Sequence, residues 1–216
     1  MGNPFAIPQS KPFEKAPAGI HVAIAIRIVD VGTRQTEWKG QKKEQHRIMV
    51  TWELPSVRMT EGENAGKPFV ITKFYTLSMY DNSRLRKDID AWRGVKLTDK
   101  QADEFNITKL LKVPCMLQII HDTAKDGKEY ANINAIMGVP AGTTVPPMVN
   151  ESYYLSLSPE YFDPAVFAKL GDKMRETIMQ TPEWKELGAA ARAAAEAAPK
   201  TGGAGGVTDI DDDIPF

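Results

Sequence analysis

Hydrophobic and polar residues alternate along several short stretches of this chain, most clearly in IHVAIAIRIV at residues 20–29. A period of two over about nine residues predicts a β-strand with one buried face. That face would carry Ile20, Val22, Ile24, Ile26 and Ile28. The segment HRIMVTWEL at 46–54 alternates in the same way, so we expect a second strand with Trp52 on its buried side.

Three more strands and two helices follow from the pattern. Residues 68–78, 113–122 and 130–139 are the expected strands. A helix from Asn82 or Ser83 to about Trp92 precedes a second helix that a capping box at Thr98 opens and that runs toward Leu111. Three strands, a helical insert and two strands predict a mainly β protein with helices, a five-stranded OB-fold barrel. A mixed α+β sheet would give a similar pattern.

Parity also predicts which side chains the last two strands bury. The fourth strand would turn Val113, Cys115, Leu117 and Ile119 inward, and the fifth Ala131, Ile133 and Ala135. Trp92 falls on the apolar stripe of its helix and is expected in the core. Residues 30–45, between the first two strands, are polar and contain two glycines, which predicts a loop.

Composition divides the chain further. Four prolines before residue 18, a Pro/Gly/Thr stretch after Gly138, alanine-rich helical sequence and a glycine-rich stretch mark the boundaries. The expected parts are an extended arm (1–18), an OB-fold domain (19–140), a linker (141–152), a helical extension (153–198), a flexible linker (199–207) and a disordered acidic tail (208–216).

The net charge of −1 hides an asymmetry between the two ends of the chain. Residues 1–137 hold 21 Lys and Arg against 16 Asp and Glu, a balance of +5, whereas residues 138–216 hold 6 against 12, a balance of −6. A basic body with an acidic end indicates a surface for a polyanion and a separate tail.

Cations and aromatic residues gather where single-stranded nucleic acid would bind an OB-fold. Cations contact phosphates, aromatic faces stack on unpaired bases, and the loops after strands one and four flank the groove. The candidate residues are Arg27, Arg34, Trp38, Lys39, Lys42, Lys43, Arg47, Lys73, Phe74, Tyr75, Lys125, Lys128, Tyr130 and Asn132. The alternative for Trp38 and the lysines is a solvated loop with the indole folded onto the barrel, and strand three leaves open which of Phe74 and Tyr75 faces outward.

Nothing in the sequence favours catalysis. The three histidines lie on expected strands without metal-ligand spacing, the single cysteine faces the core, and no phosphate-binding loop of the G-x-x-x-x-G-K-[ST] type occurs. We therefore expect no catalytic residue, metal or cofactor. Without a signal-peptide pattern or a run of about 20 apolar residues, the expected location is the cytoplasm.

The chain ends in TDIDDDIPF, which combines four aspartates with a terminal aromatic residue. Solubility alone would not require Phe216, so we expect a docking peptide formed by Asp209, Asp211, Asp212, Asp213, Ile214, Pro215 and Phe216. The last six residues resemble the C-terminal tip of bacterial single-stranded DNA-binding proteins. That resemblance implies recruitment of replication, recombination and repair proteins.

The body carries a second resemblance. GIHVAIAIRIVDVGTRQTEWKG, HRIMVTWEL, ITKFYTLSMYDNSRLRKDIDAWRG and YANINAIMGVP are similar to bacteriophage single-stranded DNA-binding proteins with a divergent OB-fold. This implies a non-enzymatic protein that protects single-stranded DNA in the bacterial host's cytoplasm. The alternatives are a recombination mediator or replisome adaptor that acts through protein contacts, a nuclease or helicase accessory subunit with metal at the tail aspartates, and RNA as the ligand. Self-association and the role of residues 153–198 are left open.

Overall fold

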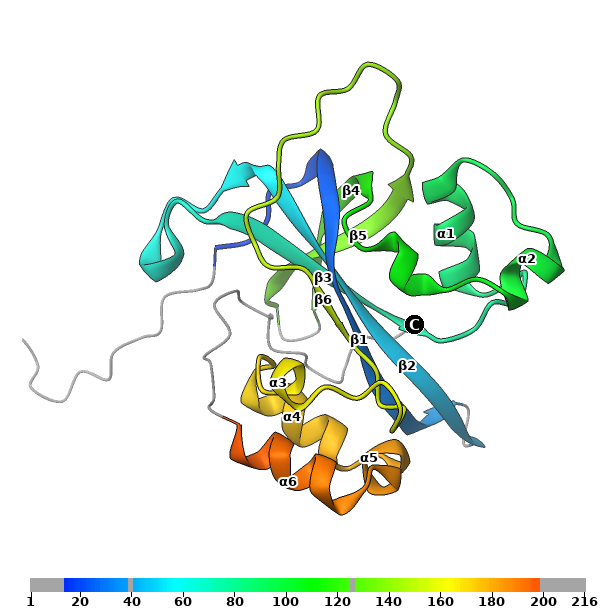
Figure 1. Cartoon of the computed structure of the whole chain (residues 1–216). Helices are drawn as coiled ribbons and strands as arrows, with labels where there is room; N and C mark the ends of the chain where they lie inside the picture. The colour runs from blue at the N-terminus through cyan, green and yellow to red at the C-terminus, as the bar shows by residue number, and fades with distance from the viewer. Residues whose placement is uncertain (1–13, 39–40, 125–126, 199–216) are drawn as a thin grey trace, which may run out of the picture.

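The computed structural model describes residues 14–38, 41–124 and 127–198, which form an antiparallel β-sheet with two separate groups of helices (Figure 1). Its strands are β1 (Gly19–Trp38), β2 (Gln41–Arg58), β3 (Pro68–Thr76), β4 (Pro114–Thr123), β5 (Glu129–Met137) and β6 (Tyr153–Leu155). The order across the sheet is β3-β2-β1-β4-β5, and β6 pairs in parallel with β1. The prediction of a mainly β protein with helices is confirmed.

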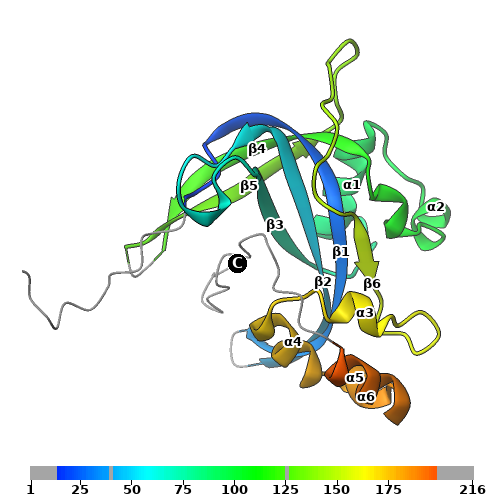
Figure 2. The ribbon, with the colours of Figure 1, turned by 60° about the vertical axis from the view of Figure 1, so that its left-hand side comes forward.

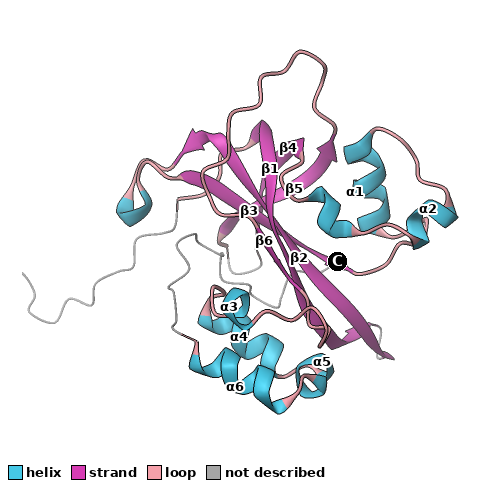
Figure 3. Cartoon of the chain, viewed as in Figure 1, coloured by secondary structure: helices cyan, strands magenta, loops and turns pink. Residues whose placement is uncertain are grey.

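Two helical groups flank this sheet (Figure 3). The insert between β3 and β4 holds α1 (Arg84–Arg93), α2 (Asp99–Asp103) and the 3-10 turn η2 (Ile107–Leu110), and a second 3-10 turn, η1 (Gly62–Asn64), joins β2 to β3. The C-terminal group holds α3 (Pro164–Phe167), α4 (Asp172–Met179), α5 (Pro182–Glu186) and α6 (Ala189–Ala197).

The predicted start and end of the first insert helix are confirmed, but the second helix is shorter than predicted. The Ser83 side chain accepts a hydrogen bond from Arg86 N at the start of α1, and Gly94 ends the helix in the left-handed conformation. Thr98 and Gln101 form the capping box of α2. That helix stops at Asp103 instead of reaching toward Leu111, because η2 begins a new turn after an intervening loop.

A first core fills the inner face of the sheet beneath the insert. Trp52 is 1% exposed and packs against Trp92 with ring centroids 5.9 Å apart, so both predicted core tryptophans are confirmed. Cys115, Leu117 and Ile119 join them. Val113 does not, because it precedes β4 and is 36% exposed.

A second core lies between the C-terminal helices and the opposite, outer face of β1 and β2. Val29 and Met49 supply the sheet side of this core. Phe167 stacks on Trp184 with ring centroids 4.7 Å apart, and Leu157 packs in the same core. The helical extension is therefore packed along the β1–β2 hairpin, as both views show (Figures 1 and 2).

The prediction of a loop at residues 30–45 is wrong. β1 continues to Trp38 and β2 begins at Gln41, with cross-strand pairs such as Thr36 with Lys43. Charged residues have low strand propensity, but on a hairpin that projects beyond the core they point into water while the backbone remains paired. We call the distal part of this hairpin, residues 31–38 and 41–47, the hairpin arm.

The predicted inner face of β1 is also wrong in part. The register between β1 and β2 shifts next to Ala25, and the extra residue in a bulge reverses the side on which the preceding residues lie. Ala23 and Ala25 consequently line the first core, whereas Ile20 is 58% exposed. Ile24 and Ile26 are buried outside that core.

A second shift, in the register between β4 and β5, changes the fifth strand. It brings Ile136 into the first core beside Ile133 and leaves Ala135, predicted inward, only partly buried. Within the described residues no backbone pairing joins β3 to β5, so the sheet remains open there rather than closing into the predicted barrel.

Residues 149–155, expected to be linker and the start of the helical extension, instead bind to the sheet. β6 was not predicted and adds a strand to the edge of β1. In the expected linker, the backbone N–H groups of Val149 and Asn150 donate to the fully buried carboxylate of Glu53, at 2.8 and 2.7 Å. This stretch is thus fixed to the sheet.

Candidate nucleic-acid interface

The hairpin arm carries the densest group of predicted DNA contacts that the structure describes. Lys42 and Lys43 are exposed on β2, and Arg34 is half-buried on β1. The arm projects from the body beside the C-terminal helices (Figure 1). Because the two strands are paired from Gly32 with Arg47 to Trp38 with Gln41, its cations lie on a regular scaffold rather than on a loop.

An arginine–aromatic pair lies where the arm joins the sheet. Arg47 on β2 places its guanidinium 5.5 Å from the ring centroid of Phe74 on the neighbouring strand β3. Both side chains are half-buried on the outer face, next to the exposed Thr76. Guanidinium and aromatic planes are the surfaces on which unpaired bases stack.

Arg27 lies beneath β6, although we predicted that it would be on the open surface of the DNA-binding groove. Its guanidinium is 5.4 Å from the Tyr153 ring centroid, and Lys169 contacts the same ring at 5.5 Å. Burial raises the pKa of Tyr153, although the positive charges of Arg27 and Lys169 act to lower it. The outer face of the sheet beside Arg27 is therefore covered by β6 and the residues around it.

Lys73 and Tyr75 belong to a buried cluster in the opening between β3 and β5. Lys73 Nζ donates to Asp88 at 2.9 Å and to the Ile133 carbonyl at 3.2 Å, so this side chain bridges the unpaired strands. The Tyr75 hydroxyl donates to the same carboxylate at 2.9 Å. Burial lowers the pKa of Lys73, partly offset by Asp88, and raises that of Tyr75. Tyr75 is 3% exposed and cannot stack on a base from this position.

The expected second wall of the groove lies on the β4–β5 hairpin. Lys128 is exposed near its tip, Tyr130 is half-buried, and Asn132 donates to Asp122 across the hairpin at 2.9 Å. This hairpin and the hairpin arm project in different directions (Figure 2). The structure thus does not bring the two predicted walls together.

Several predicted residues lie outside the described residues. These are Lys39, Lys125, the side chain of Trp38 and the whole tail from Asp209 to Phe216.

Sequence reasoning missed a polar cluster at the base of the hairpin arm. His46 Nε2 lies 2.8 Å from Asp30 Oδ1, and Glu183 of α5 accepts a hydrogen bond from the Thr33 backbone N–H at 2.9 Å. Gly32 sits beside this cluster with φ +78°, directly against Thr181. Since Glu183 is about 150 residues from Thr33, no local pattern would have revealed the contact.

Searches of protein-family models, curated proteins and solved structures found no match to this chain. Among the described residues, no helix has the length and apolar character needed to span a membrane.

Proposed function

We propose that this protein binds single-stranded DNA without marked sequence preference, using the hairpin arm and the Arg47–Phe74 pair. The observation that carries the proposal is a projecting two-stranded arm with exposed cations next to an arginine whose guanidinium lies over an aromatic ring. Phosphates would follow the cations, and bases would stack at the pair.

We further propose that the fold is a divergent OB-fold whose barrel is left open. The argument is the strand order, in which β1 is shared between β2 and β4, with a helical insert between β3 and β4. Covering of the outer face around Arg27 would move the DNA path away from the centre of the sheet and toward the arm.

In this proposal the protein is non-enzymatic and phage-encoded, and it protects single strands during replication and recombination in the bacterial cytoplasm. The resemblance of the tail and the body to single-stranded DNA-binding proteins supports that setting. The acidic tail would recruit partner proteins through Phe216 and the aspartates before it.

The arm is tested with the double variant Lys42→Ala/Lys43→Ala. Removing one phosphate contact reduces the slope of log K against log salt by about 0.7 for single strands, so we expect a decrease of about 1.4 for an oligo-dT ligand. The matched control is Lys87→Ala/Lys100→Ala, two exposed lysines on α1 and α2 in the helical insert. Equal slopes for wild type and the arm variant would show that Lys42 and Lys43 do not contact phosphates. If the protein were an adaptor that acts only through other proteins, the wild type would bind no oligo-dT.

A further inference from the structure

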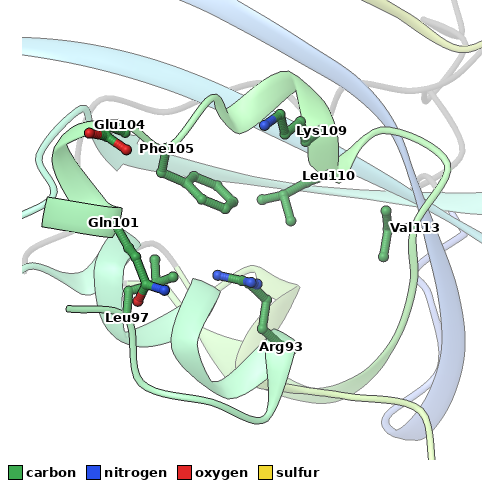
Figure 4. Close-up of a pocket in the computed structure, with 8 residues that line it drawn as sticks. All are labelled: Arg93, Leu97, Gln101, Glu104, Phe105, Lys109, Leu110 and Val113. Atoms are coloured by element: carbon green, nitrogen blue, oxygen red, sulfur yellow. The ribbon is translucent and has the colours of Figure 1, made fainter.

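The helical insert contains a cavity that the proposed DNA-binding surface does not use. Its volume is about 440 Å³, and it opens between α1, α2 and η2 (Figure 4). Its apolar walls come from Leu97, Phe105, Leu110 and Val113. In both overall views the insert lies apart from the C-terminal helices and from the tip of the hairpin arm (Figures 1 and 2).

Two cations line this cavity, and within the described residues neither forms an ion pair. Arg93 places its guanidinium 5.6 Å from the Phe105 ring centroid, and Lys109 is exposed on η2. The Arg93, Phe105 and Leu110 side chains point toward the hollow (Figure 4). One carboxylate, Glu104, also lines it, so the charge of the lining is net positive. A suitable ligand combines an apolar or aromatic group with negative charge.

The C-terminal segment of this chain has that chemistry. It contains Ile214, Pro215 and Phe216, preceded by four aspartates between residues 209 and 213. Eighteen residues (216 − 198) follow Ala198, the last residue described. Fully extended they reach roughly 60 Å. A compact chain of this length has a radius of gyration of about 17 Å, hence a diameter of about 45 Å, so the tail is long enough to reach the insert.

We propose that the cavity of the helical insert binds the C-terminal segment of this same protein. The Phe216 ring would lie among the apolar walls with Phe105, and the aspartates that precede it would pair with Arg93 and Lys109. The bound segment would be held away from partner proteins, which would compete with the cavity for it. The hairpin arm would remain uncovered, so this proposal does not depend on DNA binding.

Photocrosslinking of the full-length chain with benzoylphenylalanine in place of Phe216 tests the proposal. We expect crosslinks within residues 93–113, mapped by mass spectrometry. The double variant Arg93→Glu/Lys109→Glu should reduce their yield about fivefold or more, because two attractive charges become repulsive. The control Lys87→Glu/Lys185→Glu changes charge equally and should retain the yield. Crosslinks to the hairpin arm, to α3–α6 or to no defined segment would overturn the proposal.

A competition experiment covers the case in which a cavity variant fails to fold. A synthetic peptide of residues 208–216, added to the otherwise unaltered crosslinking protein, should suppress the 93–113 crosslinks, and the same peptide with alanine for Phe216 should suppress them at least about fivefold less well. Equal suppression by both peptides would show that Phe216 does not occupy the cavity.

Discussion

His46 Nδ1 on the hairpin arm lies 3.2 Å from Glu183 Oε1 on helix α5. The other ring nitrogen of His46 contacts Asp30, so one imidazole bridges two carboxylates from distant parts of the chain. The Thr33 backbone N–H completes the contact by donating to Glu183. This polar cluster joins the arm to the C-terminal helices, next to the second hydrophobic core.

The cluster predicts a pH-dependent stability. The hydrogen bond to Asp30 and the charges of Asp30 and Glu183 outweigh desolvation and raise the pKa of His46 above its ordinary 6.5. Burial acts to raise the pKa of Glu183, but the Thr33 hydrogen bonds and the His46 charge outweigh it and lower the value below 4.5. The His46 contribution is therefore complete below pH 6.5 and is lost as pH rises through its folded pKa. The Glu183 contribution is present above pH 4.5 and is lost as pH falls through its own folded pKa.

We expect the free energy of unfolding of the wild type to exceed that of His46→Asn by about 1 kcal/mol between about pH 5 and 6.5. The difference should shrink at higher pH, measured by urea unfolding across the range. Glu183→Gln removes one of the two carboxylates and should lower the pKa of His46 in an NMR titration. A wild-type advantage that stays constant up to pH 9 would contradict the charged bridge.

Gly32 is expected to be intolerant of any side chain. Its φ of +78° favours glycine, and a Cβ would lie 2.7 Å from Thr181 Cγ2. We expect Gly32→Ala to destabilise the protein by about 2–4 kcal/mol, part from backbone strain and part from the clash with α5. Gly66→Ala is the matched control, because Gly66 has φ +82° with open space around it. Equal losses in urea unfolding for both variants would show that the arm and α5 are not in close contact.

Lys73 is expected to stabilise the fold without contacting DNA. Lys73→Met removes the bridge between β3 and β5, while Asp88 retains Arg84 and Tyr75 as partners. We therefore expect a loss of about 1–3 kcal/mol in the free energy of unfolding. Oligo-dT affinity, measured under conditions in which the variant is folded, should be unchanged. A large fall in the salt dependence of oligo-dT binding by Lys73→Met would show instead that Lys73 contacts DNA.

Phe74 is expected to contribute stacking rather than charge. Phe74→Leu retains an apolar side chain against the second core but removes the aromatic face below Arg47. A stacked base contributes about 1–3 kcal/mol, so oligo-dT affinity in an anisotropy titration should fall at least about fivefold with an unchanged salt slope. Tyr161→Leu, at an aromatic residue 60% exposed outside this surface, is the control. Equal affinities for Phe74→Leu and wild type would exclude stacking at Phe74.

Local patterns in the sequence were enough for the existence of β1 to β5 and of the two insert helices, and for much of the first core. Period-two alternation identified part of β1, β2, β4 and β5, and the Ser83 and Thr98 caps identified both insert helices. Trp52 and Trp92 were placed in the core correctly because strand parity and helical spacing hold wherever the backbone is regular.

The remaining features depend on contacts that local patterns do not encode. The register shifts at Ala25 and at Ile119 change which side chains of the strand face the core, and no residue in the sequence signals either shift. The hairpin arm is paired although its sequence favours a loop. Tyr75 is buried because Asp88, from another element, provides a partner for its hydroxyl. β6 forms only because residues after β5 return to the edge of β1.

The most direct test of the central claim is a fluorescence anisotropy titration of the wild-type chain with oligo-dT and with a duplex of equal length, over a range of salt concentrations. We expect the single strand to bind at least about tenfold more tightly at each concentration, with affinity falling as salt rises. Equal affinity for the two ligands, or no binding of the single strand at low salt, would contradict the claim that this protein binds single-stranded DNA.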